Sequence, residues 1–221
     1  MTKRMVIVTG GTLGPWAEQE LRKDDVLIGA DKGALHLVRL GLQPDYSVGD
    51  FDSVSSAELE EIRSRSKEIM IYDPVDKDWT DTEMAFNWAI SQNPSEITLL
   101  GALGSRWDHS LSNIHLLRKG LDSGVPCKII DANNEIMLIN GAVSVWRSRF
   151  TNISLLPLSM EVTGITLRGF QYPLINAALR IGESLGISNV LIEDQGYIEV
   201  ETGYLLVIQS KDDDPASLSD N

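Results

Sequence analysis

Two short acidic segments of this chain combine residue types that could bind a metal ion. They are Gly49-Asp50-Phe51-Asp52-Ser53 and, further along the chain, Lys77-Asp78-Trp79-Thr80-Asp81. On an extended backbone the side chains of Asp50 and Asp52 point to the same side. Two carboxylates about 4 Å apart repel each other by roughly 4 kcal/mol at an effective dielectric constant near 20. A divalent cation with oxygen ligands is the usual counter-charge, so the pattern indicates metal-assisted chemistry.

The acidic segments share a position, because each follows a short apolar run that is predicted to be a buried strand. In a parallel sheet the carboxyl ends of the strands lie along one edge, and open α/β sheets bind their ligands there. Four loops are therefore expected to converge on one crevice. The residues of these loops that could contact a ligand are Asp31, Lys32, Asp50, Asp52, Lys77, Asp78, Thr80, Asp81, Arg106, Asp108 and His109.

Basic residues and glycines accompany the carboxylates. Lys32, Lys77 and Arg106 are the candidates for contacts with phosphate groups. Glycines at strand-to-helix turns allow the backbone to approach a phosphate closely. The dinucleotide fingerprint and the Walker P-loop have no support, since Gly10-Gly11-Thr12-Leu13-Gly14 matches neither pattern. The combination indicates a polyphosphate held by Mg²⁺ on carboxylates.

Several of these residues also have a purely structural interpretation. Thr80 could serve only as a helix N-cap, and Asp31 and Asp108 could serve only the start of a helix. His109 is either a ligand-binding residue or an ordinary surface residue. A structural role accounts least well for the pair Asp50 and Asp52, because two adjacent carboxylates repel each other.

The first part of the chain alternates strand-like and helix-like segments, which is typical of a parallel sheet covered on both faces. The predicted strands are residues 5–8, 26–28, 46–48, 69–72, 97–100 and 128–130. Ser55, Thr80 and Ser105 each stand three positions before an acidic residue, as in a capping box. The apolar face of the last helix is predicted to consist of Leu111, Ile114, Leu117 and Leu121. Residues 1–132 are therefore predicted to form a Rossmann-like α/β domain.

The pattern changes after residue 132 to short apolar runs separated by Gly, Asn and Pro. The predicted strands are residues 136–139, 143–146, 153–156, 161–163, 165–167, 190–192, 197–200 and 204–208. Closely spaced strands without a long helix predict an antiparallel β-sandwich or barrel. Residues 133–210 are assigned to a smaller β-sandwich. Residues 211–221 form an acidic tail that is expected to be disordered.

The amino-acid composition argues against several classes of protein. The 221 residues carry a formal net charge of −13, which argues against binding to nucleic acid or to an anionic membrane. One cysteine cannot build a disulfide framework or a thiolate zinc site. The apolar runs are too short for a signal peptide or a membrane span, so a cytoplasmic protein is expected.

With these residues in place, the chain resembles thiamine pyrophosphokinases of the bacterial type over nearly its whole length. The motifs that carry the resemblance are Ala30-Asp31-Lys32-Gly33-Ala34, Pro44 to Ser53, Asp76 to Glu83, Gly101 to His109, Gly186-Ile187-Ser188-Asn189 and Gly203 to Ile208. The resemblance implies a homodimer in which an α/β domain binds ATP and Mg²⁺ and a β-sandwich binds thiamine at the subunit interface. It implies transfer of the pyrophosphoryl group of ATP to the hydroxyl of thiamine, which gives thiamine diphosphate and AMP.

The resemblance also assigns roles to residues. Asp50, Asp52 and Asp78 are the expected metal ligands, with Asp81 as an alternative to Asp78. Lys77, Thr80 and Arg106 are expected to position phosphates, with Asp31, Lys32 and His109 also in contact with the nucleotide. The proton acceptor is Asp108 or one of the metal-site carboxylates, so the expected catalytic residues are Asp50, Asp52, Asp78, Asp81 and Asp108. Ser188 and Asn189 match a pair near the thiamine site, contributed by the partner subunit.

Two other functions are compatible with the same residues. One is a Mg²⁺-dependent kinase or pyrophosphokinase that acts on another small alcohol. The other is a non-catalytic sensor of a nucleotide or of thiamine. The full set of carboxylates argues against the sensor, because without catalysis there is no reason to keep repelling charges together.

Overall fold

The computed structural model describes residues 2–72 and 79–213. Among the predicted site residues, Lys77 and Asp78 lie outside the described residues, as does most of the acidic tail. The chain divides into two compact units, residues 1–132 and residues 133–221. Each unit is described by itself below.

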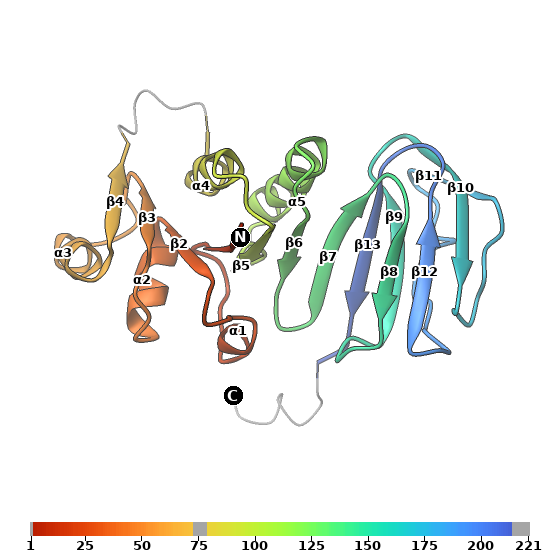
Figure 1. Ribbon diagram of the computed structural model, residues 1–221, viewed down its shortest axis with the longest axis horizontal. Helices are drawn as coiled ribbons and strands as arrows, with labels where there is room; N and C mark the ends of the chain where they lie inside the picture. Colours follow the sequence, from red (N-terminus) through yellow and green to blue (C-terminus); the bar gives the residue numbers. More distant parts are fainter. Residues whose placement is uncertain (1, 73–78, 214–221) are drawn as a thin grey trace. The chain divides into compact units, whose positions relative to one another are not determined.

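The first unit is built on six parallel strands in the order β4-β3-β2-β1-β5-β6 (Figure 1). The strands are β1 (Arg4–Val8), β2 (Val26–Ala30), β3 (Tyr46–Gly49), β4 (Glu68–Ile71), β5 (Glu96–Leu100) and β6 (Cys127–Ile130). All six were predicted from the apolar runs, with small differences at their ends. Because β1 lies between β2 and β5, the chain order reverses there, and this is where open sheets form a ligand crevice.

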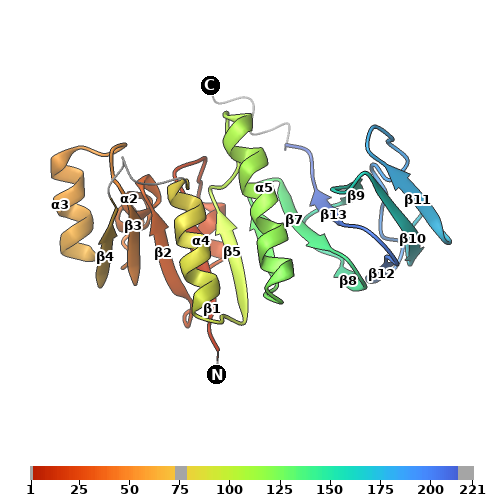
Figure 2. The same ribbon diagram turned by 90° about the horizontal axis from the view of Figure 1, so that it is seen from above.

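In the described part of this unit, five helices connect the strands. They are α1 (Trp16–Gln19), α2 (Lys32–Arg39), α3 (Ser56–Arg65), α4 (Asp81–Ser91) and α5 (Trp107–Asp122). Helices α4 and α5 pack together on one face of the sheet, and α2 lies on the other face, where it contacts α3 (Figure 2). Both faces of the central strands are therefore covered, which explains why these strands read as continuous apolar runs.

Two of the three predicted capping boxes are borne out at least in part. The Ser55 hydroxyl accepts from the Glu58 amide, and the Glu58 carboxylate accepts from the Ser55 amide. Thr80 accepts from the Glu83 amide at 3.2 Å. The prediction for Ser105 is wrong, since α5 begins at Trp107 with Arg106 in the N-cap position and without a side-chain cap.

The predicted apolar face of α5 is also wrong in part. Leu111 is 50% exposed, whereas Leu117 is buried. The buried residues of this helix are Ser110, Asn113, Leu116, Leu117 and Gly120. The buried face of α5 therefore includes two polar residues, Ser110 and Asn113. Their hydrogen-bond partners lie in the loop before the helix.

The second unit contains two antiparallel groups of strands. One has the order β7-β13-β9, and the other has the order β11-β10-β12-β8. The strands are β7 (Asn134–Ile139), β8 (Val143–Trp146), β9 (Asn152–Pro157), β10 (Glu161–Arg168), β11 (Ala177–Arg180), β12 (Gln195–Glu199) and β13 (Leu205–Ser210). Apolar residues of both groups form one core cluster, which includes Ile153, Val162, Ile198 and Val207.

Three strand predictions for this unit need correction. Residues 161–163 and 165–167 belong to the single strand β10, because Gly164 adopts φ +69° at an irregularity in the pairing rather than ending the strand. Residues 190–192 form only an isolated bridge, between Leu191 and Phe170. The strand β11 was not predicted, since Ala177–Arg180 offers little β-branched sequence.

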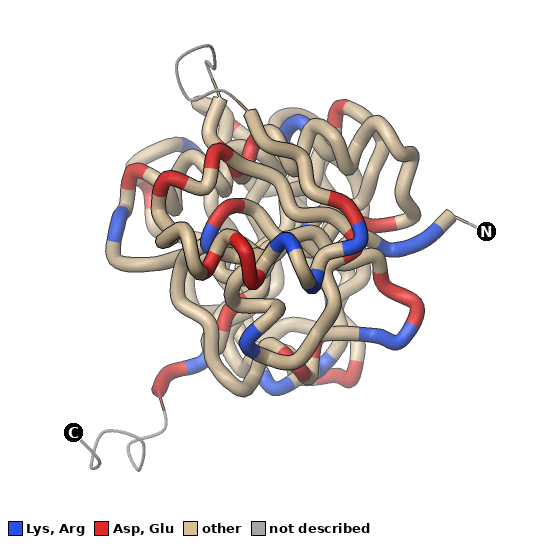
Figure 3. Tube along the Cα trace, turned by 90° about the vertical axis from the view of Figure 1, so that its left-hand side faces the viewer, with Lys and Arg blue, Asp and Glu red and all other residues tan. Residues whose placement is uncertain are grey.

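The described helices include none that is long and apolar enough to cross a membrane. Acidic and basic residues are interspersed along the described chain (Figure 3).

Gly33 sets the position of α2 against β1. A Cβ atom added at Gly33 would lie 1.9 Å from the carbonyl oxygen of Val8 and 2.8 Å from the Cα atom of Thr9. These contacts are with backbone atoms, which cannot rotate away. The start of α2 therefore approaches the carboxyl end of β1 at a distance that only glycine permits.

We expect Gly33→Ala to lower the free energy of unfolding by about 3 kcal/mol, since overpacking against backbone cannot relax through a side chain. Gly141→Ala is the matched control, because an added Cβ there meets no atom within 4 Å. Urea denaturation followed by circular dichroism measures both. A Gly33→Ala protein as stable as the Gly141→Ala protein would contradict this account of the helix–strand contact.

Candidate active site

Three carboxylates come together at the carboxyl edge of the sheet. Asp31 follows β2, and Asp50 and Asp52 follow the neighbouring strand β3. One carboxylate oxygen from each residue can be chosen so that all three lie within 4.8 Å of one another. Asp31 and Asp50 are half-buried, and Asp52 is exposed. The predicted convergence of acidic loops is thus seen in the geometry of these three residues.

The turn after β3 has a different shape from the one assumed in the sequence analysis. Strand β3 ends at Gly49, so Asp50 and Asp52 do not lie on an extended strand. Phe51 between them adopts φ +58° and is buried among apolar residues of α2 and α3. The backbone amide of Asp52 donates to Oδ1 of Asp50 at 3.1 Å. The buried ring of Phe51 anchors the turn, and the turn brings the two flanking carboxylates together.

Asp31 has an unusual environment for a carboxylate. Its backbone adopts φ +49° at the start of α2, and its Oδ2 atom accepts from the Ser53 hydroxyl. Its Oδ1 atom is buried and lacks a hydrogen-bond partner among the described residues. Burial raises the pKa of Asp31, against the effect of the Ser53 hydrogen bond, and the negative charges of Asp81 and Asp52 raise it further. The fold thus holds Asp31 where its charged form is disfavoured.

This donor set fits a Mg²⁺ ion. Mg²⁺ prefers oxygen ligands at about 2.0–2.1 Å, so opposite ligands lie about 4.2 Å apart, and the 4.8 Å spread needs shifts of less than about 1 Å. A cation would supply the partner that Oδ1 of Asp31 lacks. It would also compensate the repulsion among the three carboxylates. The sequence analysis had assigned Asp31 to the nucleotide, and its place in this cluster is new.

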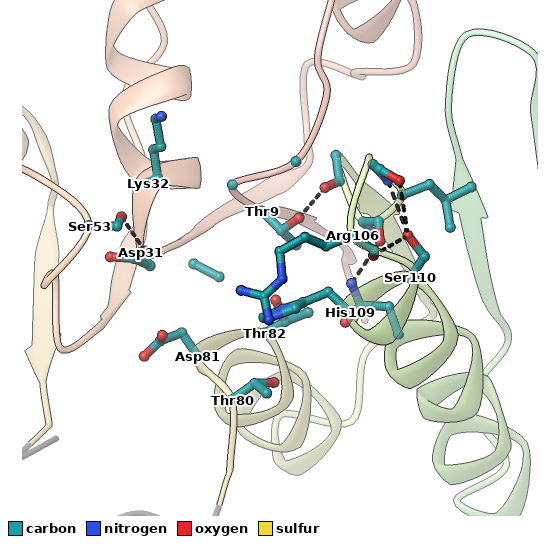
Figure 4. Close-up of a pocket in the computed structure, with 18 of the residues that line it drawn as sticks. Thr9, Asp31, Lys32, Ser53, Thr80, Asp81, Thr82, Arg106, His109 and Ser110 are labelled. Carbon is teal, nitrogen blue, oxygen red and sulfur yellow. Dashed lines mark hydrogen bonds between the residues drawn. The ribbon is translucent and has the colours of Figure 1, made fainter. Parts of the chain in front are cut away.

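A hollow of about 300 Å³, here called the first hollow, opens beside the cluster. Its lining includes the predicted residues Asp31, Lys32, Thr80, Asp81, Arg106 and His109. Asp31 follows β2, Lys32 begins α2, and the other four residues lie at the starts of α4 and α5 (Figure 4). Asp50 is tied to this group, since its backbone amide donates to Oδ1 of Asp81 at 3.2 Å.

Arg106 supplies positive charge to the first hollow. Its guanidinium group extends from the start of α5 toward the middle of the hollow (Figure 4). Nη2 of Arg106 lies 2.6 Å from Oδ2 of Asp108, and both side chains are largely exposed. Hydrogen bonding from Arg106 lowers the pKa of Asp108. Asp108 does not belong to the lining of the first hollow, so its clearest role in the geometry is to hold Arg106.

The loop between β5 and α5 is held in place by side chains that were not among the predicted site residues. The Thr9 hydroxyl donates to the Gly101 carbonyl. The Asn113 amide donates to the Ala102 carbonyl at 2.7 Å, and Asn113 is buried. The Ser110 hydroxyl accepts from the Gly104 amide at 3.2 Å. Arg106, Ser110 and Asn113 are three or four residues apart, so helical spacing from Arg106 is the signal that could have identified the two polar residues on α5.

Two further predicted site residues are described within their own unit. Ser188 and Asn189 belong to the second unit. Ser188 is exposed and adopts φ +58°. Asn189 is buried, and its side chain is bonded to backbone: Oδ1 accepts from the Tyr172 and Val190 amides, and Nδ2 donates to the Tyr172 carbonyl. Asn189 therefore fixes the backbone around it.

Comparisons with known proteins assign both units. A family model described as "Thiamin pyrophosphokinase, catalytic domain" matches residues 17–129. A second, described as "Thiamin pyrophosphokinase, vitamin B1 binding domain", matches residues 142–205. The thiamine pyrophosphokinase of Bacillus subtilis is 35% identical over 214 residues, which cover 95% of this chain and 100% of that protein.

Solved structures agree with the sequence comparisons. The crystal structure of thiamine pyrophosphokinase from Bacillus subtilis superimposes with a TM-score of 0.88 at 33% identity and covers 95% of this chain and 100% of that one. The enzyme from Geobacillus thermodenitrificans gives a TM-score of 0.86 at 33% identity, over 95% of this chain and 98% of that one. The chain belongs to the thiamine pyrophosphokinase family.

Proposed function

We propose that this protein transfers the pyrophosphoryl group of ATP to the hydroxyl group of thiamine. The hydroxyl oxygen forms a bond to the β-phosphorus, the bond from the β-phosphorus to the oxygen bridging to the α-phosphorus breaks, and the hydroxyl proton is lost. The products are thiamine diphosphate and AMP. The observation that carries the proposal is the cluster of Asp31, Asp50 and Asp52 beside a hollow lined by Arg106 and Lys32.

In this proposal, Asp31, Asp50 and Asp52 hold Mg²⁺, and Asp78 stays a predicted further ligand. A bound Mg²⁺ neutralises charge on the polyphosphate and aligns the reacting groups. Asp81 accepts a hydrogen bond from the Asp50 backbone amide and so fixes the turn that carries Asp50 and Asp52. Its own carboxylate adds negative charge that strengthens the attraction for the cation.

The polyphosphate lies in the first hollow. Arg106 binds it with the charge-assisted donors of its guanidinium group. Lys32, Lys77, Thr80 and His109 are the further proposed contacts. Thr80 already accepts from the Glu83 amide, and its hydroxyl hydrogen stays available to a phosphate oxygen. The braced loop between β5 and α5 keeps Arg106 in position without reorganisation during the reaction.

The proton acceptor is proposed to be a carboxylate of the cluster. Asp108 is less suited to this role, because Arg106 lowers its pKa and occupies its oxygens. Asp108 is instead assigned to positioning Arg106.

The two units take separate roles in the proposal. The first unit, a Rossmann-like domain over residues 1–132, binds ATP and Mg²⁺. The second, a β-sandwich over residues 133–210, binds thiamine and forms a homodimer. Ser188 is the exposed member of the predicted thiamine pair, while Asn189 holds the backbone next to it. A cytoplasmic location stays a prediction from the sequence.

Exposed apolar residues support the homodimer. Between residues 172 and 192, five large apolar side chains are more than half exposed: Tyr172 (59%), Ile175 (85%), Ile181 (56%), Leu185 (63%) and Ile192 (62%). We propose that these side chains contribute to the dimer interface, because large apolar side chains left exposed often mark an interaction site.

A product assay tests the reaction directly. We expect ATP and thiamine to give AMP and thiamine diphosphate, and we expect EDTA to abolish turnover. ADP with thiamine monophosphate would show that a single phosphoryl group is transferred instead. Turnover with another alcohol but not with thiamine would support the alternative kinase, and ligand binding without any turnover would support the sensor.

We expect Asp50→Asn and Asp52→Asn each to lower kcat by about 100-fold or more, because a metal ion supplies several kcal/mol of transition-state stabilisation and 1.4 kcal/mol is a factor of ten. Asp24→Asn is the matched control, since Asp24 is exposed and lies outside the cluster and the first hollow. Steady-state kinetics with saturating Mg²⁺ measure the effect. Wild-type kcat in either cluster variant would rule out a catalytic role for that carboxylate.

We expect Asp31→Asn to raise the melting temperature of the metal-free protein, because the variant removes a negative charge that burial and neighbouring carboxylates disfavour. The raised pKa of Asp31 means that its charged form destabilises the fold. This cost is present above the raised pKa and disappears as the pH falls toward the ordinary carboxyl value, so the difference should shrink in acid.

Thermal unfolding with and without Mg²⁺ completes this test. Mg²⁺ should raise the melting temperature of the wild type and of Asp24→Asn, but it should have little effect on Asp31→Asn. Equal stabilisation of all three proteins by Mg²⁺ would remove Asp31 from the metal site.

We expect Ile175→Asp to shift the protein from dimer to monomer, because a buried unpaired charge at an interface is costly. Ile71→Asp is the control, since Ile71 is 49% exposed on the first unit. Light scattering coupled to size exclusion gives the mass of each. A monomeric wild type would contradict the proposed homodimer.

A further inference from the structure

The hydroxyl group of Ser53 joins the two turns that carry the carboxylate cluster. Ser53 follows Asp52 on the turn after β3, and its hydroxyl donates to Oδ2 of Asp31, which follows β2 (Figure 4). Ser53 also lines the first hollow, although it was not among the predicted site residues. A hydrogen bond to one oxygen of a carboxylate limits the number of oxygens that the carboxylate offers to a cation.

The two carboxylate oxygens of Asp31 have different surroundings. Oδ2 accepts from the Ser53 hydroxyl, whereas Oδ1 is buried and has no hydrogen-bond partner within the described part of the chain. Leaving a buried acceptor without a partner is costly, and a cation would supply that partner. Asp31 therefore offers a cation one oxygen, Oδ1, as long as the bond from Ser53 is kept.

Asp50 shows a related arrangement. Its Oδ1 atom accepts from the backbone amide of Asp52 at 3.1 Å. If Asp50 bound a cation through both carboxylate oxygens, this hydrogen bond within the turn would be weakened or lost. Two of the three carboxylates of the cluster thus have one oxygen already engaged by the protein.

The backbone of the two turns is held together independently of Ser53. The Asp31 amide donates to the Val48 carbonyl at 2.8 Å. An added Cβ at Gly49 would lie 3.2 Å from the Cα atom of Asp31, so the two turns are in close contact. The ring of Phe51 is buried and anchors the second turn. Removal of the Ser53 hydroxyl is therefore expected to release a carboxylate oxygen without displacing the turns.

Mg²⁺ and Ca²⁺ differ in the number of protein oxygens that they need. Mg²⁺ is octahedral, keeps several waters and is bound through few carboxylate oxygens, whereas Ca²⁺ takes about 6–8 oxygens and accepts bidentate carboxylates. Ca²⁺ binds oxygens at about 2.3–2.6 Å, so the 4.8 Å spread of the cluster admits this ion as well as Mg²⁺. The number of available oxygens, rather than their spacing, must therefore distinguish the two ions.

We propose that Ser53 determines the metal specificity of the site: by engaging Oδ2 of Asp31, it restricts Asp31 to one ligand oxygen and so favours Mg²⁺ over Ca²⁺. The proposal rests on the proposed function, because it requires Asp31, Asp50 and Asp52 to hold the metal. Ser53 acts through Asp31 and is a positioning residue. Without its hydroxyl, both oxygens of Asp31 become available to one Ca²⁺ ion, and the orientation that presents Oδ1 to Mg²⁺ is lost.

Three variants test this role. Ser53→Ala removes the hydrogen-bond donor, and Ser53→Thr keeps a hydroxyl group at the same position. The matched control is Ser56→Ala, because Ser56 is exposed at the start of α3 and lies outside the cluster and the first hollow. Thermal unfolding of the metal-free protein at increasing concentrations of Mg²⁺ or Ca²⁺, without nucleotide, gives the dissociation constant of each ion.

We expect Ser53→Ala to lower the ratio of the Ca²⁺ to the Mg²⁺ dissociation constant by about tenfold, the size of effect that partners of metal ligands commonly have on metal affinity. Ser53→Thr and Ser56→Ala should keep the ratio within about twofold of the wild type. An unchanged ratio in Ser53→Ala would overturn the proposal, as would equal weakening of both ions, which a merely structural role predicts. A Ser53→Thr protein that behaves like Ser53→Ala would also overturn it, since the hydroxyl group would then not be responsible.

These binding measurements need no turnover, so the two proposals can fail separately. If the wild type binds both ions but forms no thiamine diphosphate, the proposed function fails, while a lowered ratio in Ser53→Ala still supports the role of Ser53. If thiamine diphosphate forms and the ratio is unchanged, only the role of Ser53 is overturned. If neither ion stabilises the wild type, the cluster is not a metal site in the absence of nucleotide and the role of Ser53 is overturned with it.

Discussion

The electrostatic repulsion among Asp31, Asp50 and Asp52 is the constraint around which the first unit is organised. Like charges at this spacing separate unless the backbone that carries them is fixed. Here the backbone is fixed by burial: Phe51 is locked among apolar residues, and Gly33 lets α2 approach β1 closely enough to define where Asp31 begins the helix. Both Asp31 and Phe51 adopt positive φ, which costs conformational energy that the surrounding packing must offset. The stability of the core therefore maintains a strained, charged turn at the edge of the sheet.

The opposite wall of the site holds a positively charged side chain, Arg106, in a protein whose net charge is negative. Its position is fixed in a different way. Arg106 is largely exposed, so packing does not fix its side chain. Its position comes instead from the loop before α5, to which Ser110 and Asn113 contribute buried hydrogen bonds. A buried amide or hydroxyl must be satisfied, and these two are satisfied by the backbone of the loop. Helix α5 therefore carries polar residues on part of its buried face, and these residues hold the loop before the helix in place.

What could be predicted from the sequence depends on whether burial or a particular hydrogen bond fixes a residue. The parallel strands were predictable because strands buried on both faces are continuous apolar runs, and the carboxylates after β2 and β3 could be assigned to one edge for that reason. The orientation of Asp31 could not, because it depends on a left-handed residue and on the Ser53 hydroxyl. Asn113 was missed, because its helical spacing from Arg106 gives only the face of α5 on which it lies, and the fold of the loop before the helix decides which carbonyl its amide meets. Gly164 was read as a strand end, although cross-strand pairing continues on both sides of it.

The net charge of −13 bears on how the cluster of Asp31, Asp50 and Asp52 would act in the proposed reaction. An acidic protein repels a polyphosphate anion, and salt screens this repulsion only beyond about 8–10 Å. At closer range, Asp31 and Asp81 line the same hollow as Arg106 and Lys32, and Asp50 and Asp52 lie beside Asp31. The carboxylates of Asp31, Asp50, Asp52 and Asp81 formally carry −4 and the two basic side chains carry +2, so a divalent cation on the cluster would bring the local sum of −2 to zero. In the proposed reaction, a metal ion would therefore contribute to polyphosphate binding before it contributes to the chemistry.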